Sequence, residues 1–271
     1  MFKTLWQSLK TGVVTTAYPR SSAAVSNRAR GKPEIDWANW TDARPAAAVC
    51  PTGAIECGDG PGAAALDLGK CVFCGLCAEA DKAIRMTNRC ELAAVSRDAL
   101  RLRAPRPHDH DRPPPAAGVE ATEDLGERLR ARIRSVLGRS LHIREVDAGS
   151  CNGCEVEIHG LNSPDYDLER VGIQLVASPR HADMLLVTGP VTRNMELALR
   201  KTYDATPDPR LVVAVGACGC SGGIFGTNYA SCGAVATVVP VDVFIPGCPP
   251  NPHALLHGIL LAIGRLAARR T

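Results

Sequence analysis

The residues of this 271-residue chain with the most distinctive chemistry are its 12 cysteines. Thiolates bind metals in reducing compartments, whereas secreted chains pair their cysteines as disulfides. The first residues, MFKTLWQSLKTGVV, contain no apolar core long enough for a secretory signal and no small-residue cleavage site. We therefore expect the cysteines to bind metal in a reducing cytosol.

Four cysteines between residues 50 and 77 follow part of the spacing found in bacterial two-cluster ferredoxins. The run in those proteins is C-x2-C-x2-C-x3-C-P, and its last cysteine ligates the other cluster. Cys71, Cys74 and Cys77 occupy the first three positions of one run, with Asp81 at the fourth. Cys50, which is followed by proline, stands at the fourth position of the other run.

The cysteines missing from the two runs are complementary. The first three positions of the other run hold Trp40, Ala43 and Ala46, so only the ligand that it donates is left. One complete set of four thiolates therefore remains, and it predicts one 4Fe–4S cluster. Its ligands would be Cys50, Cys71, Cys74 and Cys77. A zinc site on the same thiolates is the alternative.

A second set of cysteines follows three predicted strands. Cys151 and Cys154 come after the segment Leu141–Val146, and Cys218 and Cys248 each end a later apolar segment. Ligands of open α/β sheets bind at the carboxyl ends of strands, and Gly216, Gly222 and Gly223 leave room there for a cofactor. The sequence thus predicts a second 4Fe–4S cluster. The ligands assigned to it are Cys151, Cys154, Cys218 and Cys248.

The remaining cysteines have no such assignment. Cys220 lies two residues after Cys218 and competes with it for the third ligand position. Cys57, Cys90 and Cys232 have no partner at a ligand spacing, and we interpret them as ordinary buried or surface residues.

The elements that must position these cysteines indicate two domains joined by a linker. The boundaries we predict are 1–32 for a tail or surface helix, 33–100 for a cysteine-rich domain, 101–122 for a linker and 123–271 for a second domain. Residues 103–118 combine Pro, His, Asp and Arg, which is linker composition. Within them, the run His108, Asp109, His110 and Asp111 is interpreted as a solvated spacer rather than a metal site.

Alternating strand and helix patterns predict the fold of the second domain. Apolar, β-branched segments alternate with stretches long enough for helices, which indicates an α/β domain with a mainly parallel sheet. An amphipathic helix is predicted over Glu123–Leu137 and another helix over Asn194–Thr202. The predicted strands are Leu141–Val146, Val171–Ala177, Met184–Thr188, Leu211–Val215 and Val238–Ile245.

Composition excludes other classes of protein. Hydrophobic residues make up 45% of the chain, which is typical of a globular protein. The net charge of +3 gives no basic excess for nucleic-acid binding. No apolar run reaches the ~18 residues of a membrane span, and no Rossmann or P-loop motif follows a strand.

Several motifs carry a resemblance to known families. RGKPEID, CPTGAI, the CxxCxxC run and NRCELA resemble the polyferredoxin-like subunit of formate hydrogenlyase and the two-cluster subunit of complex I. CNGCEVEIHGLNSP, SPRHADMLLVTGPVTRNM, GACGCSGGIFG and PVDVFIPGCPP resemble the small subunit of membrane-bound group 4 nickel–iron hydrogenases and the related 20 kDa subunit of complex I. The complex I branch has two adjacent cysteines at the first ligand position, so the spacing of Cys151 and Cys154 favours the hydrogenase branch.

The resemblance implies a fold and a function. It implies a flavodoxin-like C-terminal domain, a small α+β ferredoxin-like N-terminal domain and an electron-transfer role in a complex peripheral on the inner face of the cell membrane. The implied partners are a large subunit with a nickel–iron site, membrane-arm proton-pump-like subunits and a soluble donor or acceptor of the formate dehydrogenase or ferredoxin type. It favours Cys218 over Cys220, and it places His159, Arg180, His181 and Asp183 in matching motifs as possible interface, potential-tuning or structural residues.

Two alternatives stay open. A complex I-like subunit would pass electrons towards quinone, and a zinc-stabilised assembly module would use the same thiolates without redox activity. As a hydrogenase subunit the chain would be catalytically incomplete alone, because the resemblance implies that the nickel–iron site belongs to a separate large subunit.

Overall fold

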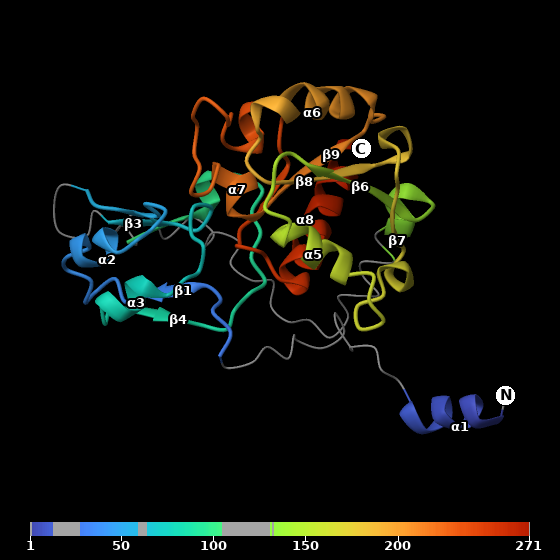
Figure 1. Ribbon diagram of the computed structural model, residues 1–271, viewed down its shortest axis with the longest axis horizontal. Helices are drawn as coiled ribbons and strands as arrows, with labels where there is room; N and C mark the ends of the chain where they lie inside the picture. Colours follow the sequence, from blue (N-terminus) through green and yellow to red (C-terminus); the bar gives the residue numbers. More distant parts are fainter. Residues whose placement is uncertain (1, 13–27, 59–63, 105–130, 132, 271) are drawn as a thin grey trace.

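The computed structural model describes residues 2–12, 28–58, 64–104, 131 and 133–270. Figure 1 shows a C-terminal half built on one sheet, with the N-terminal half beside it. Residues 105–122 of the predicted linker lie outside the described residues, including the His-Asp run at 108–111. Most of the predicted helix Glu123–Leu137 also lies outside them, although residues 133–137 are helical and Ile133 is buried.

Five parallel strands form the sheet of the C-terminal half, in the order β10-β9-β8-β6-β7. The mainly parallel sheet predicted from the sequence is thereby confirmed. Numbered from β6, this is the 2-1-3-4-5 order of flavodoxin-like sheets. Every residue of β8 and β9 is buried, as expected of parallel strands with helices on both faces. The strands are β6 (Leu141–Asp147), β7 (Ile173–Leu175), β8 (Met184–Thr188), β9 (Leu211–Val215) and β10 (Val243–Ile245).

Helices cover both faces of this sheet. On one face, Ile158 of α5 and Ile259 of α8 join the apolar cluster formed by the strands. On the other face, Leu199 of α6 and Cys220 of α7 do the same, and Figure 1 shows α6 on the side opposite α5 and α8. The helices are α5 (Gly153–Gly160), α6 (Arg193–Ala205), α7 (Gly216–Ser221) and α8 (Pro252–Arg270). No helix in the described part of the chain is long and apolar enough to cross a bilayer.

The N-terminal half is a small α+β unit. β1 pairs with β4 and β2 pairs with β3, in both cases antiparallel, while the two short helices α2 and α3 contact each other. β5 extends the second sheet by pairing with β3, so residues 101–103, which were expected to begin the linker, belong to a strand. The elements are α1 (Phe2–Thr11), β1 (Pro33–Ile35), α2 (Arg44–Ala48), β2 (Ile55–Glu56), β3 (Ala65–Asp67), α3 (Leu76–Ala80), β4 (Ile84–Met86) and β5 (Arg101–Arg103).

The two halves share one apolar cluster. Leu66 and Ile84 of the N-terminal half belong to the same buried group as Val187 and Val212 of the parallel sheet. The backbone of Ala94 also pairs with edge strand β10, through hydrogen bonds of 2.9 Å and 2.8 Å to and from Phe244. The segment that joins β4 to β5 therefore covers this edge of the parallel sheet.

Candidate metal centres

The first cysteine set lies on two loops of the N-terminal half. Cys50 follows α2, Cys71 and Cys74 lie in the loop between β3 and α3, and Cys77 is inside α3. Phe73 and Gly75 have positive φ angles of 55° and 85°, which turn the loop sharply before α3 begins. These turns place three cysteines within one short loop and its following helix.

Backbone amides point at two of these sulfurs. The amide of Ala54 lies 3.2 Å from the Sγ of Cys50, and the amide of Phe73 lies 3.3 Å from the Sγ of Cys71. Hydrogen bonds of this kind stabilise thiolate charge, and around iron–sulfur clusters they help to set the reduction potential.

The electrostatics of the first set show that its thiols are neighbours. Burial raises the pKa of Cys71 to about 12, with further contributions from the thiolates of Cys77, Cys50 and Cys74. Burial also raises the pKa of Cys77, with contributions from Cys74 and Cys50. Burial opposes ionisation of Cys50, but the amides of Thr52, Ala54 and Ile55 and the Thr52 hydroxyl lower its pKa overall. Thiols with raised pKa values stay protonated at neutral pH, and a positively charged metal or cluster among them would favour their thiolate forms.

The positions that lack cysteines are filled by core side chains. Trp40, Ala43 and Ala46 are 4%, 8% and 0% exposed, and all three belong to the shared apolar cluster. The ring of Trp40 also packs at 5.5 Å from that of Trp37. Apolar packing therefore occupies the positions where the sequence pattern would place the ligands of another cluster.

Three loops bring the second cysteine set together at the carboxyl edge of the parallel sheet. Cys151 and Cys154 follow β6, with Cys154 in the first turn of α5. Cys218 lies in α7 directly after β9, and Cys248 follows β10. The amide of Ala217 donates to the carbonyl of Gly247 over 2.7 Å, which joins the loops after β9 and β10.

Glycines make the space between these loops. A Cβ on Gly216 would lie 2.8 Å from the Sγ of Cys154, and one on Gly223 would lie 2.7 Å from the Sγ of Cys218. Both glycines have positive φ angles, so their backbone conformations also disfavour larger residues. Two of the three glycines singled out in the sequence thus allow close approach of backbone to sulfur, whereas the third, Gly222, packs against the backbone of Gly226 and Gly233.

Ionised thiols of the second set would also repel one another. Burial raises the pKa of Cys154, and the charges of Glu155, Cys218, Cys248 and Cys151 raise it further. For Cys218, burial is again the main cause of a pKa of about 11, followed by Cys248, Cys151 and Glu155. All four predicted ligands are therefore electrostatic neighbours, as in the first set.

The cysteines without an assignment have other surroundings. Cys220, the competitor of Cys218, is 1% exposed, and its Sγ lies 3.8 Å from the carbonyl oxygen of Ala214. The thiol of Cys232 donates to Glu196 over 3.2 Å. Cys57 is exposed and Cys90 is half-buried.

Of the four polar residues in matching motifs, two make structural contacts. His159 lies 3.1 Å from the carboxylate of Glu145, and Asp183 accepts two hydrogen bonds, at 2.8 Å and 2.9 Å, from Arg139. Arg180 and His181 are exposed and line a cavity of about 690 Å³ near the amino ends of β8 and β9. The cysteines do not line this cavity, so it lies apart from both candidate centres.

Sequence reasoning missed two buried acids. Glu155, beside Cys154, is 6% exposed and accepts a hydrogen bond from the hydroxyl of Thr188. Asp67, four residues before Cys71, forms a buried ion pair with Arg97. The position of Glu155 next to a cysteine could have drawn attention to it, but no local pattern links Asp67 with a residue 30 positions away.

The donor sets fit an iron–sulfur cluster by their chemistry. Each consists of four thiolates, which is the ligand set of a 4Fe–4S cluster, and the glycine cradle of the second set leaves room beside the sulfurs. Four thiolates are also a ligand set of structural zinc. Among the described residues, no group of three or more His, Cys, Asp or Glu side chains has the arrangement of a single-ion site.

The part of the chain that matches a known protein family contains the second cysteine set. Residues 151–262 match the family described as NADH ubiquinone oxidoreductase, 20 Kd subunit. That range contains all four cysteines of the second set and none of the first.

Two curated relatives are named as subunits of a membrane-bound hydrogenase and of formate hydrogenlyase. A probable membrane-bound hydrogenase subunit of Pyrococcus furiosus is 48% identical over 52% of this chain and 84% of its own length. Formate hydrogenlyase subunit 7 of Escherichia coli is 49% identical over 51% of this chain, which spans about half (54%) of that relative. In a solved structure of the archaeal membrane-bound sulfane sulfur reductase, one chain matches 53% of this chain and 76% of its own length, with 35% identity and a TM-score of 0.44.

Proposed function

The chain belongs to the family of the 20 kDa subunit of NADH–ubiquinone oxidoreductase, and from this premise we propose that it is the iron–sulfur electron-transfer subunit of a membrane-associated group 4 hydrogenase complex of the formate hydrogenlyase type. The relatives that support this proposal are subunits of oxidoreductase complexes. The observation that carries it is the convergence of four thiols from three strand ends within the residues that match the family.

We assign the ligands of the second cluster to this convergent set. Cys154 and Cys218 are partly buried, whereas Cys151 and Cys248 are exposed at the surface. Val156, Ile224 and Phe225 are exposed apolar side chains, 60%, 64% and 52%, on the segments that carry Cys154 and Cys218. Exposed cysteines beside exposed apolar residues support this edge as the face that meets the large subunit.

We assign a first cluster to Cys50, Cys71, Cys74 and Cys77, in a ferredoxin-like domain. The two paired β-α-β halves and the amides directed at sulfur support this assignment. A bound 4Fe–4S cluster takes up and releases one electron, and its potential depends on burial and on hydrogen bonds to its sulfurs. The part of the protein is to hold the thiolates, exclude water and supply those hydrogen bonds.

Electrons would then pass between a redox partner and the active site of a large subunit through both sets of cysteines. The proposed partners are that large subunit, proton-pump-like subunits of a membrane arm and a soluble donor or acceptor of the formate dehydrogenase or ferredoxin type. Through these partners the chain would lie on the inner face of the cell membrane. The family description favours a second candidate, a complex I-like subunit whose partner passes electrons to quinone.

Metal analysis with low-temperature EPR tests the proposal. The chain would be purified without oxygen, reduced with dithionite and analysed for iron, nickel and zinc. We expect about eight irons per chain and two cubane signals, since each set holds four irons. About four irons would remove one of the two assignments, and stoichiometric zinc without iron would overturn the electron-transfer function in favour of an assembly module.

The partner decides between the two redox functions. Isolation of the intact complex through a tag on this chain would show whether its large subunit contains nickel. A large subunit without nickel, in a complex that reduces quinone, would favour the complex I-like alternative.

A further inference from the structure

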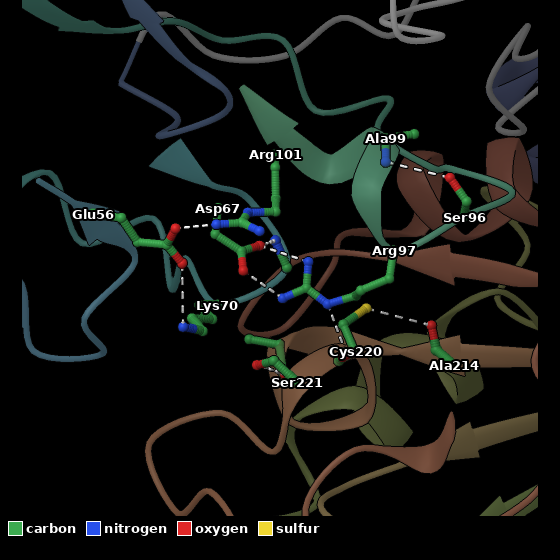
Figure 2. Close-up of polar contacts among 12 residues, drawn as sticks. Glu56, Asp67, Lys70, Ser96, Arg97, Ala99, Arg101, Ala214, Cys220 and Ser221 are labelled. Atoms are coloured by element: carbon green, nitrogen blue, oxygen red, sulfur yellow. Dashed lines mark hydrogen bonds and ion pairs between the residues drawn. The ribbon is translucent and has the colours of Figure 1, made fainter. Parts of the chain in front are cut away.

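Arg97 of the N-terminal half forms an ion pair with Asp67 of the same half and a hydrogen bond to the backbone of the C-terminal half. Arg97 lies after the segment that pairs with β10, and it donates to both carboxylate oxygens of Asp67 over 2.6 Å. Its Nε donates to the backbone carbonyl of Cys220 over 3.0 Å. Figure 2 shows the guanidinium group between Asp67 of the N-terminal half and Cys220 of the C-terminal half.

Asp67 organises the loop that carries the first cysteine set. Its carbonyl oxygen accepts hydrogen bonds from the amides of Lys70 and Cys71, both over 3.1 Å. Its carboxylate accepts another, over 2.9 Å, from the amide of Gly69. The guanidinium lies so close to Gly69 that an added Cβ would be 2.6 Å from its Cζ. The turn leading to Cys71 is therefore built on the acid that holds Arg97.

Cys220 connects Arg97 to the second set. It lies in α7 two residues after Cys218, and its carbonyl is in the last turn of that helix. Carbonyls in the last turn of a helix have no partner within the helix, and here Arg97 supplies one. A chain of hydrogen bonds thus runs from the amide of Cys71 through Asp67 and Arg97 to the helix of Cys218.

We propose that Arg97 is a positioning residue for electron transfer between the two cysteine sets. It fixes the loop of Cys71 relative to the helix of Cys218 through the hydrogen bonds of its guanidinium group to Asp67 and to the carbonyl of Cys220. The inference rests on the proposed function, since it requires a cluster in each set. In the transfer, one electron would leave the reduced cluster held by one set and enter the oxidised cluster held by the other, and no bond would be made or broken.

Arginine suits this place for two physical reasons. Its planar fork binds a carboxylate with two parallel hydrogen bonds and leaves Nε free for a third partner, a geometry that lysine cannot reproduce. Its charge is also permanent, so the guanidinium group remains a donor at any ordinary pH. The Asp67 side chain is 5% exposed and that of Arg97 is 28% exposed, so water has little access to the carboxylate and partial access to the guanidinium.

The test compares Arg97→Gln and Arg97→Lys with a matched control, Arg101→Gln. Arg101 is of similar exposure, 30%, and it pairs with Glu56 inside the N-terminal half. The full chain would be loaded with iron and sulfide, reduced with dithionite, and its iron content and the magnetic interaction between its two clusters measured by EPR. A second measurement would follow hydrogen exchange at the Cys71 amide in the cluster-free chain.

We expect Arg97→Gln to keep both cubane signals but to lose the magnetic interaction between them, while the Cys71 amide exchanges faster. Arg97→Lys should recover part of both properties, and Arg101→Gln should match the unmodified chain. An interaction in Arg97→Gln equal to that in Arg101→Gln would overturn the inference. If Arg97→Gln fails to retain iron, an unchanged interaction in iron-loaded Arg97→Lys would overturn it equally.

The EPR spectrum of the unmodified chain distinguishes failure of this inference from failure of the proposed function. Fewer than two cubane signals there would overturn the proposed function, and the inference with it, before any variant is measured. Two signals with no difference among the variants would overturn the inference alone.

Discussion

Two cysteines of α7 illustrate how the backbone assigns different roles to neighbouring thiols. The Sγ of Cys218 lies beside Gly223 and among the charges of Cys248 and Cys151. The thiol of Cys220 is buried in the apolar cluster that the two halves share, with its Sγ near the carbonyl of Ala214. A spacing of two residues on one short helix thus turns one thiol towards the candidate cluster and the other into the core.

Substitution of these two cysteines should have different effects on iron content. Cys218→Ser is expected to lower the iron of the reconstituted chain from about eight to about four atoms, because one cluster loses a ligand. Cys220→Ser should keep about eight irons, since that thiol has only a packing role, and it should lower stability by about 1 kcal/mol. Equal iron loss in both variants would contradict the assignment of Cys218, and not Cys220, as the third ligand.

The choice between these cysteines shows what the sequence could and could not predict about the site. A motif resemblance favoured Cys218, and the structure places it near Cys248, Cys151 and Cys154. The contacts of Arg97 had no such signal, because its partners Asp67 and Cys220 are 30 and 123 residues away. Ligand spacing is local in sequence, whereas the contacts that fix one site against another depend on tertiary packing.

At the scale of elements, strands buried on both faces were the easiest to predict. The predicted bounds Met184–Thr188 and Leu211–Val215 are those of β8 and β9. β7 is shorter than predicted because it pairs only with the first three residues of β6. β10 is also shorter, because a 3-10 turn at Val235–Thr237 precedes it and pairing with β9 begins only at Val243. Apolar composition shows burial, but hydrogen-bonded neighbours decide where a strand begins and ends.

The first helix is an element whose apolar side chains have few contacts. α1 exposes Leu5, Trp6 and Leu9 by 59%, 69% and 73%, and it has Lys3 and Lys10 but no acidic residue. These apolar residues lie on one side of the helix, as in helices that rest on anionic membranes. This supports the sequence-based expectation of a surface helix, which rests on a membrane or on a partner.

A pair of glutamate substitutions can test the membrane role of α1. Leu5→Glu should reduce sedimentation of the chain with anionic lipid vesicles, because it places a charge in the apolar face and repels the lipid headgroups. Gln7→Glu adds the same charge on the other side and should reduce binding less. If the two variants bind equally, or if the unmodified chain binds no vesicles, the helix would be assigned to a protein partner instead.

At the scale of the whole molecule, the two halves form one apolar core despite the linker composition between them. The cluster that contains Trp40 and Ile84 continues into Val187 and Val212 of the parallel sheet. Ala94 adds a backbone bridge to β10, and Arg97 adds a hydrogen bond to the carbonyl of Cys220. Inter-domain contacts that are small and polar permit independent motion, but a shared apolar core couples unfolding. The two halves should therefore behave as one cooperative unit.

Two spectroscopic probes can test this coupling. Trp37 and Trp40 lie in the N-terminal half, and the long helices α6 and α8 dominate the far-UV circular dichroism of the other half. We expect fluorescence and circular dichroism to give the same urea midpoint in the cluster-free chain, because coincident curves indicate a single transition. Ala94→Pro removes an amide that donates to Phe244 and should separate the two curves, with the N-terminal half unfolding first.

Bound clusters should stabilise both halves if the two halves unfold together. A ligand that binds only the folded state stabilises whatever unfolds together with its site. Cys71→Ser should therefore lower the midpoint reported by both probes, and not only that of the N-terminal half. A shift confined to tryptophan fluorescence would mean that the halves fold independently, and that the contacts of Ala94 and Arg97 orient two separate units instead of joining them in one.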